Sequence, residues 1–385
     1  MGTKTAYSVP TGVGPPALPS SCGDAVMVNV VARHGSRQSS HIEELDELAS
    51  RIGKPWKYPF AASKASLLLD RGLRESYDLA RRLKAAYPRA FPGNEPFVAT
   101  DFEVRATRKS RSVASAEAFA LGALGATSVD VSSRDDISLR FFDHCPAYEA
   151  SVDSDAGFSE LDEYLRGPKI ADALATFRHH LGNASLDDLF LAYEGCAYDF
   201  LLEEDARVVS DWCSLLGPRD NLLALEYAKD LEVWYESAGG NPLAPRAAVE
   251  LIRDFFDAFA TRRGAWRFAH AETLLPFATA LGAFDAQPPL TAAYRDDTRL
   301  FKTSLVSPMA ANLVAAAYPC VDETNRSHFR VKFSLNERDF QVPGCDDLYC
   351  DLGTLRDIFA APLRDWNFTE ICARRGPFDQ RLPRP

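Results

Sequence analysis

Residues 25–37 read AVMVNVVARHGSR, and the organisation of the chain follows from this stretch. Residues 25–32 are almost all apolar, as in a strand that is buried on both faces of a parallel sheet. The basic segment Arg33–Arg37 begins where this predicted strand ends. Because open α/β sheets bind their ligands at the carboxyl ends of the strands, we expect a ligand site at this segment.

Helix and strand signals alternate along the rest of the chain. Apolar residues at helical spacing, with glycine or proline beyond the ends, predict helices over residues 41–52, 70–87, 109–122 and 273–281. Apolar runs predict strands over residues 97–100, 266–269 and 329–335. The last of these is followed by a turn and a short segment that pairs back on it.

The middle of the chain has a different pattern, mostly helical and acidic from about residue 150 to 260. The sequence therefore predicts an α/β fold with a mixed, mainly parallel sheet flanked by helices. We expect residues 1–145 and 262–385 to form this core, and residues 146–261 to form an α-helical cap.

Composition limits the classes of partner. The 385 residues are 46% hydrophobic and carry a formal net charge of −11. An acidic surface argues against nucleic-acid binding, which needs a broad basic face, although a local arginine cluster can still attract a small anion. No apolar run approaches membrane-spanning length, so we expect no membrane contact. We also expect the protein to be a monomer.

The cysteines and sequons bear on the compartment. The start of the chain lacks the apolar segment of a signal peptide, which leaves a cytosolic protein or a mature secreted protein as alternatives. Cys196 and Cys213, and likewise Cys345 and Cys350, bracket short segments, which favours disulfides over unpaired buried thiols. Glycosylation sequons begin at Asn183, Asn325 and Asn367. We therefore expect a glycosylated protein of the secretory pathway or the exterior, whose signal peptide is absent from this sequence.

The residue types in Arg33–Arg37 suit attack on a phosphate ester. The guanidinium groups of Arg33 and Arg37 would neutralise the phosphate and grip its oxygens with paired donors. The neutral imidazole of His34 can then attack phosphorus and carry the phosphoryl group covalently. Gly35 lets the backbone pass close to the oxyanion. The alternative is a basic loop with a surface histidine, but this loop directly follows a buried strand.

Two later segments offer further groups for this chemistry. Arg105, Arg108 and Arg111 precede or open a predicted helix, whose N-terminal amides favour phosphate, although a solvated basic face would also explain the first two. His270 and Glu272 follow a predicted strand, where the carboxyl group could protonate a leaving alkoxide and the imidazole could bind a phosphoryl oxygen. A helix-start glutamate and a locally satisfied histidine would give the same pattern. We expect no metal or other cofactor, because arginines can supply the positive charge.

Three motifs together resemble the histidine acid phosphatase clan: RHGSR at 33–37, KSR at 109–111 and HAETLLP at 270–276. The His-Ala-Glu tripeptide is similar to that of the multiple inositol polyphosphate phosphatases, where other members of the clan carry His-Asp. Weaker likeness extends over residues 3–7, 141–145, 211–213 and 335–350, and so spans nearly the whole chain.

The resemblance implies roles for these residues. His34 would be the nucleophile and Glu272 the proton donor, and the residues that bind the scissile phosphate would be Arg33, Arg37, Arg111 and His270. Arg111 takes its role because it stands eight residues before Phe119, as in the second arginine motif of the clan. The resemblance also pairs Cys145 with Cys372 and Cys22 with Cys320.

The substrates that the resemblance implies are inositol hexakisphosphate, lower inositol phosphates and 2,3-bisphosphoglycerate. Such substrates are densely anionic, so we expect further cations in the cleft. The candidates are Lys54, Lys57, Lys64, Arg105 and Arg108. Two alternatives stay open: another phosphatase of the clan that acts on sugar phosphates or other monophosphates, and a non-catalytic polyanion-binding protein.

Three positions depart from the pattern of the clan. Ser39 stands where the clan usually has proline, and Ser110 and Ser112 stand where the subfamily often has histidine and cysteine. These changes bear on substrate range rather than on the reaction. The chain ends in Arg-Leu-Pro-Arg-Pro without an endoplasmic-reticulum retrieval signal, so we expect secretion rather than retention.

Overall fold

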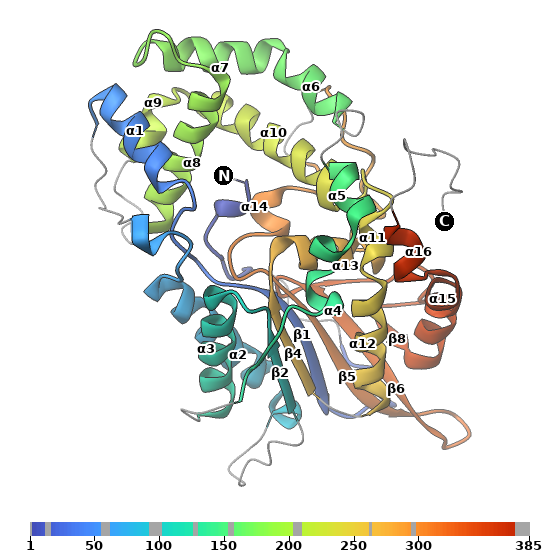
Figure 1. The fold of residues 1–385 in the computed structure, drawn as a ribbon. Helices are drawn as coiled ribbons and strands as arrows, with labels where there is room; N and C mark the ends of the chain where they lie inside the picture. The colour runs from blue at the N-terminus through green and yellow to red at the C-terminus, as the bar shows by residue number, and fades with distance from the viewer. Residues whose placement is uncertain are drawn as a thin grey trace.

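One mixed sheet forms the centre of the molecule. The computed structural model describes residues 2–11, 17–54, 62–91, 102–125, 130–152, 158–202, 210–261, 264–293 and 298–373. The strands run in the order β3-β2-β4-β1-β5-β6-β7, and β8 pairs with β6 (Figure 1). They are β1 (Met27–Arg33), β2 (Phe102–Ala106), β3 (Ser132–Ser133), β4 (Gly264–Ala269), β5 (Asn312–Val321), β6 (Ser327–Leu335), β7 (Arg338–Phe340) and β8 (Tyr349–Asp351).

The direction of strand pairing changes at β1. This strand pairs parallel with β4 on one side and antiparallel with β5 on the other. β2 and β3 continue the parallel part, and β6, β7 and β8 continue the antiparallel part. The predicted mixed sheet is confirmed, but it is not mainly parallel: among the described residues three strand pairings are parallel and four are antiparallel, because β5 and β6 form a long antiparallel pair. The strand predicted over residues 97–100 lies outside the described residues, and β2 begins later, at Phe102.

Helices cover both faces of the sheet and one of its ends. The first group is η1 (Gly2–Lys4), α1 (Ile42–Ile52), α2 (Asp70–Ala86), α3 (Ser110–Leu124), α4 (Ile137–Arg140), α5 (Pro146–Val152), α6 (Ser159–Leu165), α7 (Pro168–Arg178) and α8 (Leu186–Leu202). The second is α9 (Asp211–Leu215), α10 (Arg219–Ser237), α11 (Ala244–Ala247), α12 (Val249–Ala260), α13 (Ala271–Ala280), α14 (Thr303–Val306), α15 (Leu352–Asp365) and α16 (Phe368–Cys372). The four predicted helices are confirmed as α1, α2, α3 and α13.

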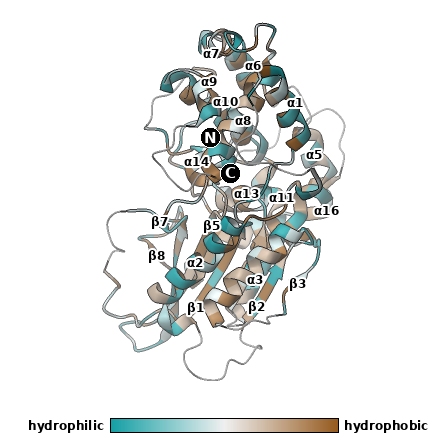
Figure 2. Ribbon diagram, turned by 90° about the vertical axis from the view of Figure 1, so that its left-hand side faces the viewer, coloured by the Kyte–Doolittle hydropathy of each residue, from teal (hydrophilic) through white to brown (hydrophobic). Residues whose placement is uncertain are grey.

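Successive residues of β1 point into two different cores. Val28 and Val30 pack with side chains of α2 and α3, whereas Val31 packs with side chains of α12 and α13. All seven residues of β1 are buried, which explains its continuous apolar pattern. In Figure 2, β1 carries hydrophobic colours behind α2 and α3, whose ribbons mix both colours as amphipathic helices do.

A helical assembly lies over one end of the sheet. In Figure 1, α6 to α10 gather above the sheet, and α1 lies with them, packed against α8. α12 instead runs along the sheet, where it contacts β4 and α4 (Figure 1). The division of the chain at residues 146 and 261 stays a prediction. It assigns α1 to the core and α12 to the cap, whereas α1 packs against α8 and α12 contacts β4.

Two of the four disulfides connect distant parts of the chain, and the other two close short segments. The pairs are Cys22–Cys320, Cys145–Cys372, Cys196–Cys213 and Cys345–Cys350, so all the expected pairings are confirmed. This many disulfides is typical of extracellular or secretory-pathway proteins. Asn183, Asn325 and Asn367 are exposed, and their glycosylation stays a prediction. No helix within the described ranges is long and apolar enough to cross a membrane.

Candidate active site

The parallel pairing of β1 with β4 brings two of the predicted motifs together. Arg33 at the end of β1 lies opposite Ala269 at the end of β4, and the His34 N–H donates to the Ala269 carbonyl at 3.0 Å. The His34 and His270 rings follow directly, with centroids 5.6 Å apart. Glu272 sits in the first turn of α13. This end of the sheet therefore carries the nucleophile candidate and the acid candidate side by side.

The loop after β1 is fixed by close backbone contacts. A Cβ atom added to Gly35 would lie 2.3 Å from the carbonyl oxygen of Gly72 in α2, so only glycine fits at this crossing. The Gly35 N–H donates to Ser115 Oγ at 3.0 Å. Ser36 donates from both its backbone N–H and its hydroxyl to the Glu75 carboxylate, each at 2.8 Å. These contacts hold His34 at one place against the sheet.

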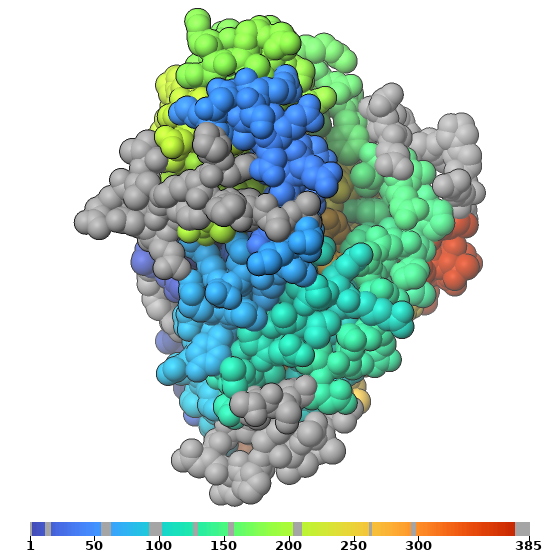
Figure 3. Space-filling model, turned by 60° about the vertical axis from the view of Figure 1, so that its left-hand side comes forward, coloured from blue at the N-terminus to red at the C-terminus, as the bar shows by residue number. Residues whose placement is uncertain are grey.

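A cavity of about 760 Å³ opens above this loop. All six principal residues from the sequence line it: Arg33, His34, Arg37, Arg111, His270 and Glu272. In the space-filling view the surface is hollowed between α1 and the region of α4 and α5, with atoms from later in the chain visible at its depth (Figure 3). The motifs thus converge on one shared space.

Three guanidinium groups in this cavity have unused donors. The Nε atoms of Arg33, Arg37 and Arg111 are buried and have no hydrogen-bond partner among the described residues. Arg33 is oriented through Nη1, which donates to the carbonyls of Thr3 at 2.5 Å and Ser307 at 2.8 Å. Buried donors without acceptors are costly, so this arrangement favours an anion with several oxygens.

The electrostatics of His34 suit a nucleophile. Burial, and then the charge of Arg33, hold the pKa of His34 well below its usual value, so the imidazole is neutral. Its Nδ1 lies 2.9 Å from the Gly35 carbonyl oxygen, which can only accept. Nδ1 therefore carries the proton, and Nε2 keeps a free lone pair.

His270 and Glu272 form a coupled pair beside it. Burial lowers the pKa of His270 to about 3, and its Nε2 lies 3.0 Å from Thr107 Oγ1. The Glu272 side chain is exposed to the open cavity, although protein atoms surround the cavity at this depth. This burial acts to raise its pKa, while the charges of His270, Arg33 and Lys4 and a backbone N–H bring it below the usual value. A bound anion would neutralise the nearby positive charges, and burial would then raise the pKa of Glu272.

Comparison with known proteins agrees with this geometry. The family described as the histidine phosphatase superfamily (branch 2) matches residues 26–335. The chain belongs to the histidine phosphatase superfamily. Among curated relatives of this phosphatase, multiple inositol polyphosphate phosphatase 1 of Gallus gallus is 28% identical over 97% of the chain and 92% of the relative. The Homo sapiens protein of that name is 27% identical over 88% of the chain and 81% of the relative.

Solved structures share the fold of this phosphatase. Bifidobacterium longum multiple inositol polyphosphate phosphatase in complex with inositol hexasulfate matches with a TM-score of 0.74 at 18% identity, over 94% of this chain and 97% of that one. The phytase from D. castellii matches with a TM-score of 0.78 at 17% identity, over 97% and 87%. The predicted family and fold class are confirmed.

The weaker cation candidates of the phosphatase do not reach the cavity. Lys54 Nζ lies 4.0 Å from Asp211 Oδ1, Lys64 is exposed, and Arg108 is exposed with its backbone N–H donating to Asp135. None of these three lines the cavity. Lys57 lies outside the described residues. A substrate contact by Lys54, Lys64 or Arg108 therefore stays a prediction.

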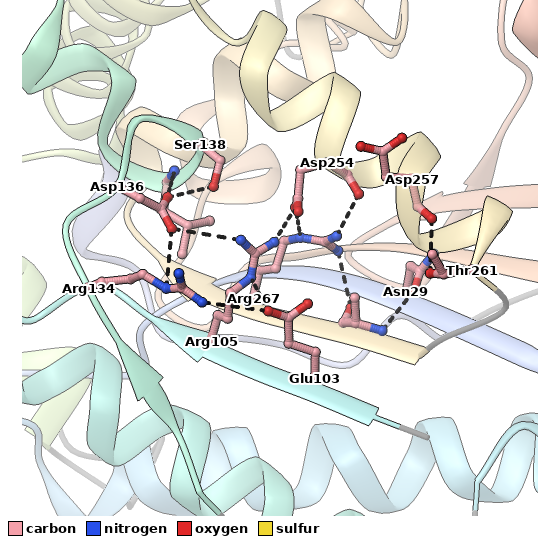
Figure 4. Close-up of polar contacts among 12 residues, drawn as sticks. Asn29, Glu103, Arg105, Arg134, Asp136, Ser138, Asp254, Asp257, Thr261 and Arg267 are labelled. Atoms are coloured by element: carbon pink, nitrogen blue, oxygen red, sulfur yellow. Dashed lines mark hydrogen bonds and ion pairs between the residues drawn. The ribbon is translucent and has the colours of Figure 1, made fainter. Parts of the chain in front are cut away.

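The structure contradicts the predicted contact of Arg105 with the substrate. It is a residue of β2, buried in an ion network on the face of the sheet that α12 covers (Figure 4). Its guanidinium contacts Asp254 and lies 3.3 Å from Glu103. Arg267, which the β2–β4 register sets opposite Arg105, donates to the same Asp254 at 2.5 Å. Arg105 therefore joins the sheet to α12, away from the cavity.

Sequence reasoning missed other charged residues of the cavity. The additional cations are Lys4, Lys109, Arg140 and Lys229, and the additional carboxylates are Glu44, Asp187, Glu194, Glu232 and Glu236. Lys109 belongs to the KSR motif and Lys4 to the segment 3–7 that resembles the family, but the others had no local signal because only tertiary folding brings them here. No group of three or more metal-ligating side chains is found in the part of the chain that the structure describes.

Ser39 stands where the clan has proline, and its side chain contacts the helical assembly. Its hydroxyl donates to Glu194 of α8 at 2.8 Å and accepts the His41 N–H at 2.9 Å. His41 Nδ1 also lies 3.1 Å from Glu194. Burial would raise the pKa of Glu194, but the bonds from His41 and Ser39 and the charge of Lys4 lower it to about 2. The bond to Glu194 raises the pKa of His41.

This contact should strengthen in mild acid. The His41 contribution is complete below its usual pKa of 6.5 and is lost as pH rises through the raised value. The Glu194 contribution is complete above 4.5 and is lost as pH falls towards about 2. We expect His41→Ala to lower the melting temperature at pH 5.5 but hardly at pH 8. The effect should stay below about 1 kcal/mol, because His41 is half exposed. Equal losses at both pH values would contradict this, and exposed His180→Ala serves as the control.

Proposed function

We propose that this phosphatase hydrolyses phosphate monoesters of inositol polyphosphates, inositol hexakisphosphate above all, through a phosphohistidine at His34. The observation that carries the proposal is the meeting of a neutral, oriented imidazole with three guanidiniums whose Nε–H groups have no acceptor among the described residues. The names of the relatives, multiple inositol polyphosphate phosphatase and phytase, support the substrate class.

The first step is transfer of the phosphoryl group to the protein. Arg33, Arg37 and Arg111 bind the non-bridging oxygens and neutralise the charge that repels a nucleophile. The lone pair on His34 Nε2 attacks phosphorus while the bond to the leaving alkoxide breaks. Glu272 gives its proton to that alkoxide, since the bound anion offsets the cations that otherwise lower the pKa of this carboxyl group.

The second step returns the protein to its starting state. Glu272, now a carboxylate, takes a proton from a water molecule that attacks the phosphohistidine. The bond between His34 Nε2 and phosphorus breaks, and inorganic phosphate leaves. His270 is held by Thr107 through Nε2, which leaves Nδ1 for a phosphoryl oxygen. We propose these roles for the six residues and propose secretion, which the four disulfides support.

The test is a substrate panel that measures released phosphate. It comprises inositol hexakisphosphate, 2,3-bisphosphoglycerate, a hexose monophosphate and p-nitrophenyl phosphate. We expect the highest kcat/KM for inositol hexakisphosphate. A clear preference for the monophosphates would favour another activity of the clan, and tight binding of inositol hexakisphosphate without phosphate release would favour a polyanion-binding protein.

A further inference from the structure

Lys4 lies in the catalytic cavity although it belongs to the N-terminal arm. The arm forms η1 and packs against α8, α10 and α14. The Thr3 carbonyl accepts from Arg33, the Thr5 carbonyl accepts the Met309 N–H at 2.8 Å, and Tyr7 donates to Glu337 at 2.7 Å. These anchors hold the arm on both sides of Lys4 and direct it along the cavity wall.

The ammonium group of Lys4 is enclosed without a partner. It makes no hydrogen bond or ion pair with any residue that the structure describes. Surrounding protein, and then the charge of Arg37, lower its pKa to about 8, while Glu194 acts in the opposite direction. An unpaired ammonium next to like charges is unfavourable, and an anion between them would reverse the balance.

Lys4 stands to one side of the three arginines. The charges that act on it most strongly are those of Arg37, Glu194 and Arg33. Arg111, by contrast, is affected by Arg37, Glu272 and Arg140. η1, which carries Lys4, contacts α8, and the Thr3 carbonyl next to Lys4 accepts from Arg33, so Lys4 lines the cavity beside the arginines. A phosphate gripped by the trio leaves the Lys4 ammonium free for a second anionic group on the same molecule.

We propose that Lys4 is a specificity-determining residue that binds a phosphate of the substrate other than the scissile one. This inference rests on the proposed function, because it needs a substrate with more than one phosphate. A ring that carries phosphates on neighbouring carbons presents a second anion beside the first. A monophosphate would fill the arginine site and make no use of Lys4.

The experiment measures the effect of one substitution, Lys4→Met, on the turnover of two substrates. Lys4→Met keeps the length of the side chain and removes its charge. We expect KM for inositol hexakisphosphate to rise roughly 10- to 100-fold, as for loss of one charge-assisted hydrogen bond. For p-nitrophenyl phosphate we expect kcat/KM to change less than about threefold. Lys4→Arg should recover most of the affinity, and Lys169→Met, a change at an exposed lysine of α7 outside the cavity, should alter the turnover of neither substrate.

Other outcomes separate this proposal from the proposed function. An equal loss on both substrates would overturn it, because Lys4 would then act at the scissile phosphate or through Arg33. An unchanged KM for inositol hexakisphosphate would overturn it too. If the wild type cleaves only p-nitrophenyl phosphate, the proposed function fails. Inhibition of that reaction by inositol hexakisphosphate then tests Lys4, since Lys4→Met should raise the inhibition constant. Lys4→Gln repeats the measurement if Lys4→Met does not fold.

Discussion

His34→Ala is expected to abolish turnover, with kcat for inositol hexakisphosphate falling on the order of 10⁵-fold or more. Without the imidazole there is no group in the loop that can accept the phosphoryl group, and the arginines alone cannot replace a covalent step. The measurement is phosphate release by the purified variant at saturating substrate. Quenching the wild type in alkali during turnover of radiolabelled substrate should trap a labelled protein, because the N–P bond of phosphohistidine survives alkali but not acid, and the variant should give none.

The variant has to be shown to fold and to bind. The side chain of His34 lines a cavity, so alanine removes contacts on one side only, and the loop keeps its bonds to Ser115 and Glu75. Binding of inositol hexakisphosphate should persist, because Arg33, Arg37 and Arg111 remain. His180→Ala, at an exposed position after α7, should leave kcat unchanged. Residual turnover within tenfold of the wild type would exclude His34 as the nucleophile.

The floor of the site was predictable from sequence because two of the three motifs directly follow a strand. Arg33 and Ala269 end neighbouring parallel strands, so their successors His34 and His270 must meet at one edge of the sheet. A run of apolar residues followed at once by a charged segment carries this information locally. Arg111 of α3 came from the family resemblance instead, and all six residues line the same cavity.

Misplacing β2 by a few residues led to the wrong role for Arg105. A strand predicted over residues 97–100 puts Arg105 in the following loop, near a phosphate. In the structure β2 covers Phe102–Ala106, so Arg105 is inside the strand and its side chain belongs to one face of the sheet. That face is covered by α12, whose Asp254 pairs with it. Sequence alone gave no sign of Asp254, which lies far along the chain.

The walls of the cavity depend on tertiary folding. Lys4 and Lys229 reach it from the N-terminal arm and α10, and neither is part of a periodic or charged segment that points to phosphate. β5 escaped prediction for a related reason. Its alanine-rich sequence has weak strand propensity and contains Pro319, and it forms a strand because it pairs with both β1 and β6. The secondary structure of such a segment is determined by the strands that it pairs with rather than by the propensities of its own residues.

Glu272→Gln is expected to lower kcat for inositol hexakisphosphate by about 10²- to 10⁴-fold while substrate binding persists. Glutamine keeps the shape of the side chain and can donate a hydrogen bond, but it cannot give a proton to the alkoxide or take one from water. An alkoxide is a poor leaving group, so its departure needs the acid. With p-nitrophenyl phosphate the phenolate leaves unaided, and the labelled phosphohistidine should therefore accumulate in the variant, because only its hydrolysis stays slow.

The pH profile gives a second, independent signature of the same carboxyl group. In the substrate complex the arginines and Lys4 are neutralised by phosphate, so burial raises the pKa of Glu272 above the value in the unoccupied protein. The protonated form is the acid, and kcat of the wild type should fall as pH rises through that raised pKa. Glu272→Gln should lose this alkaline limb, whereas exposed Glu163→Gln should retain both the limb and the wild-type rate. If Glu272→Gln keeps the alkaline limb, the proton comes from another group. The next carboxyl group to replace would then be Glu236, which also lines the cavity. Burial, and then the charge of Glu272, raise the pKa of Glu236 to about 8.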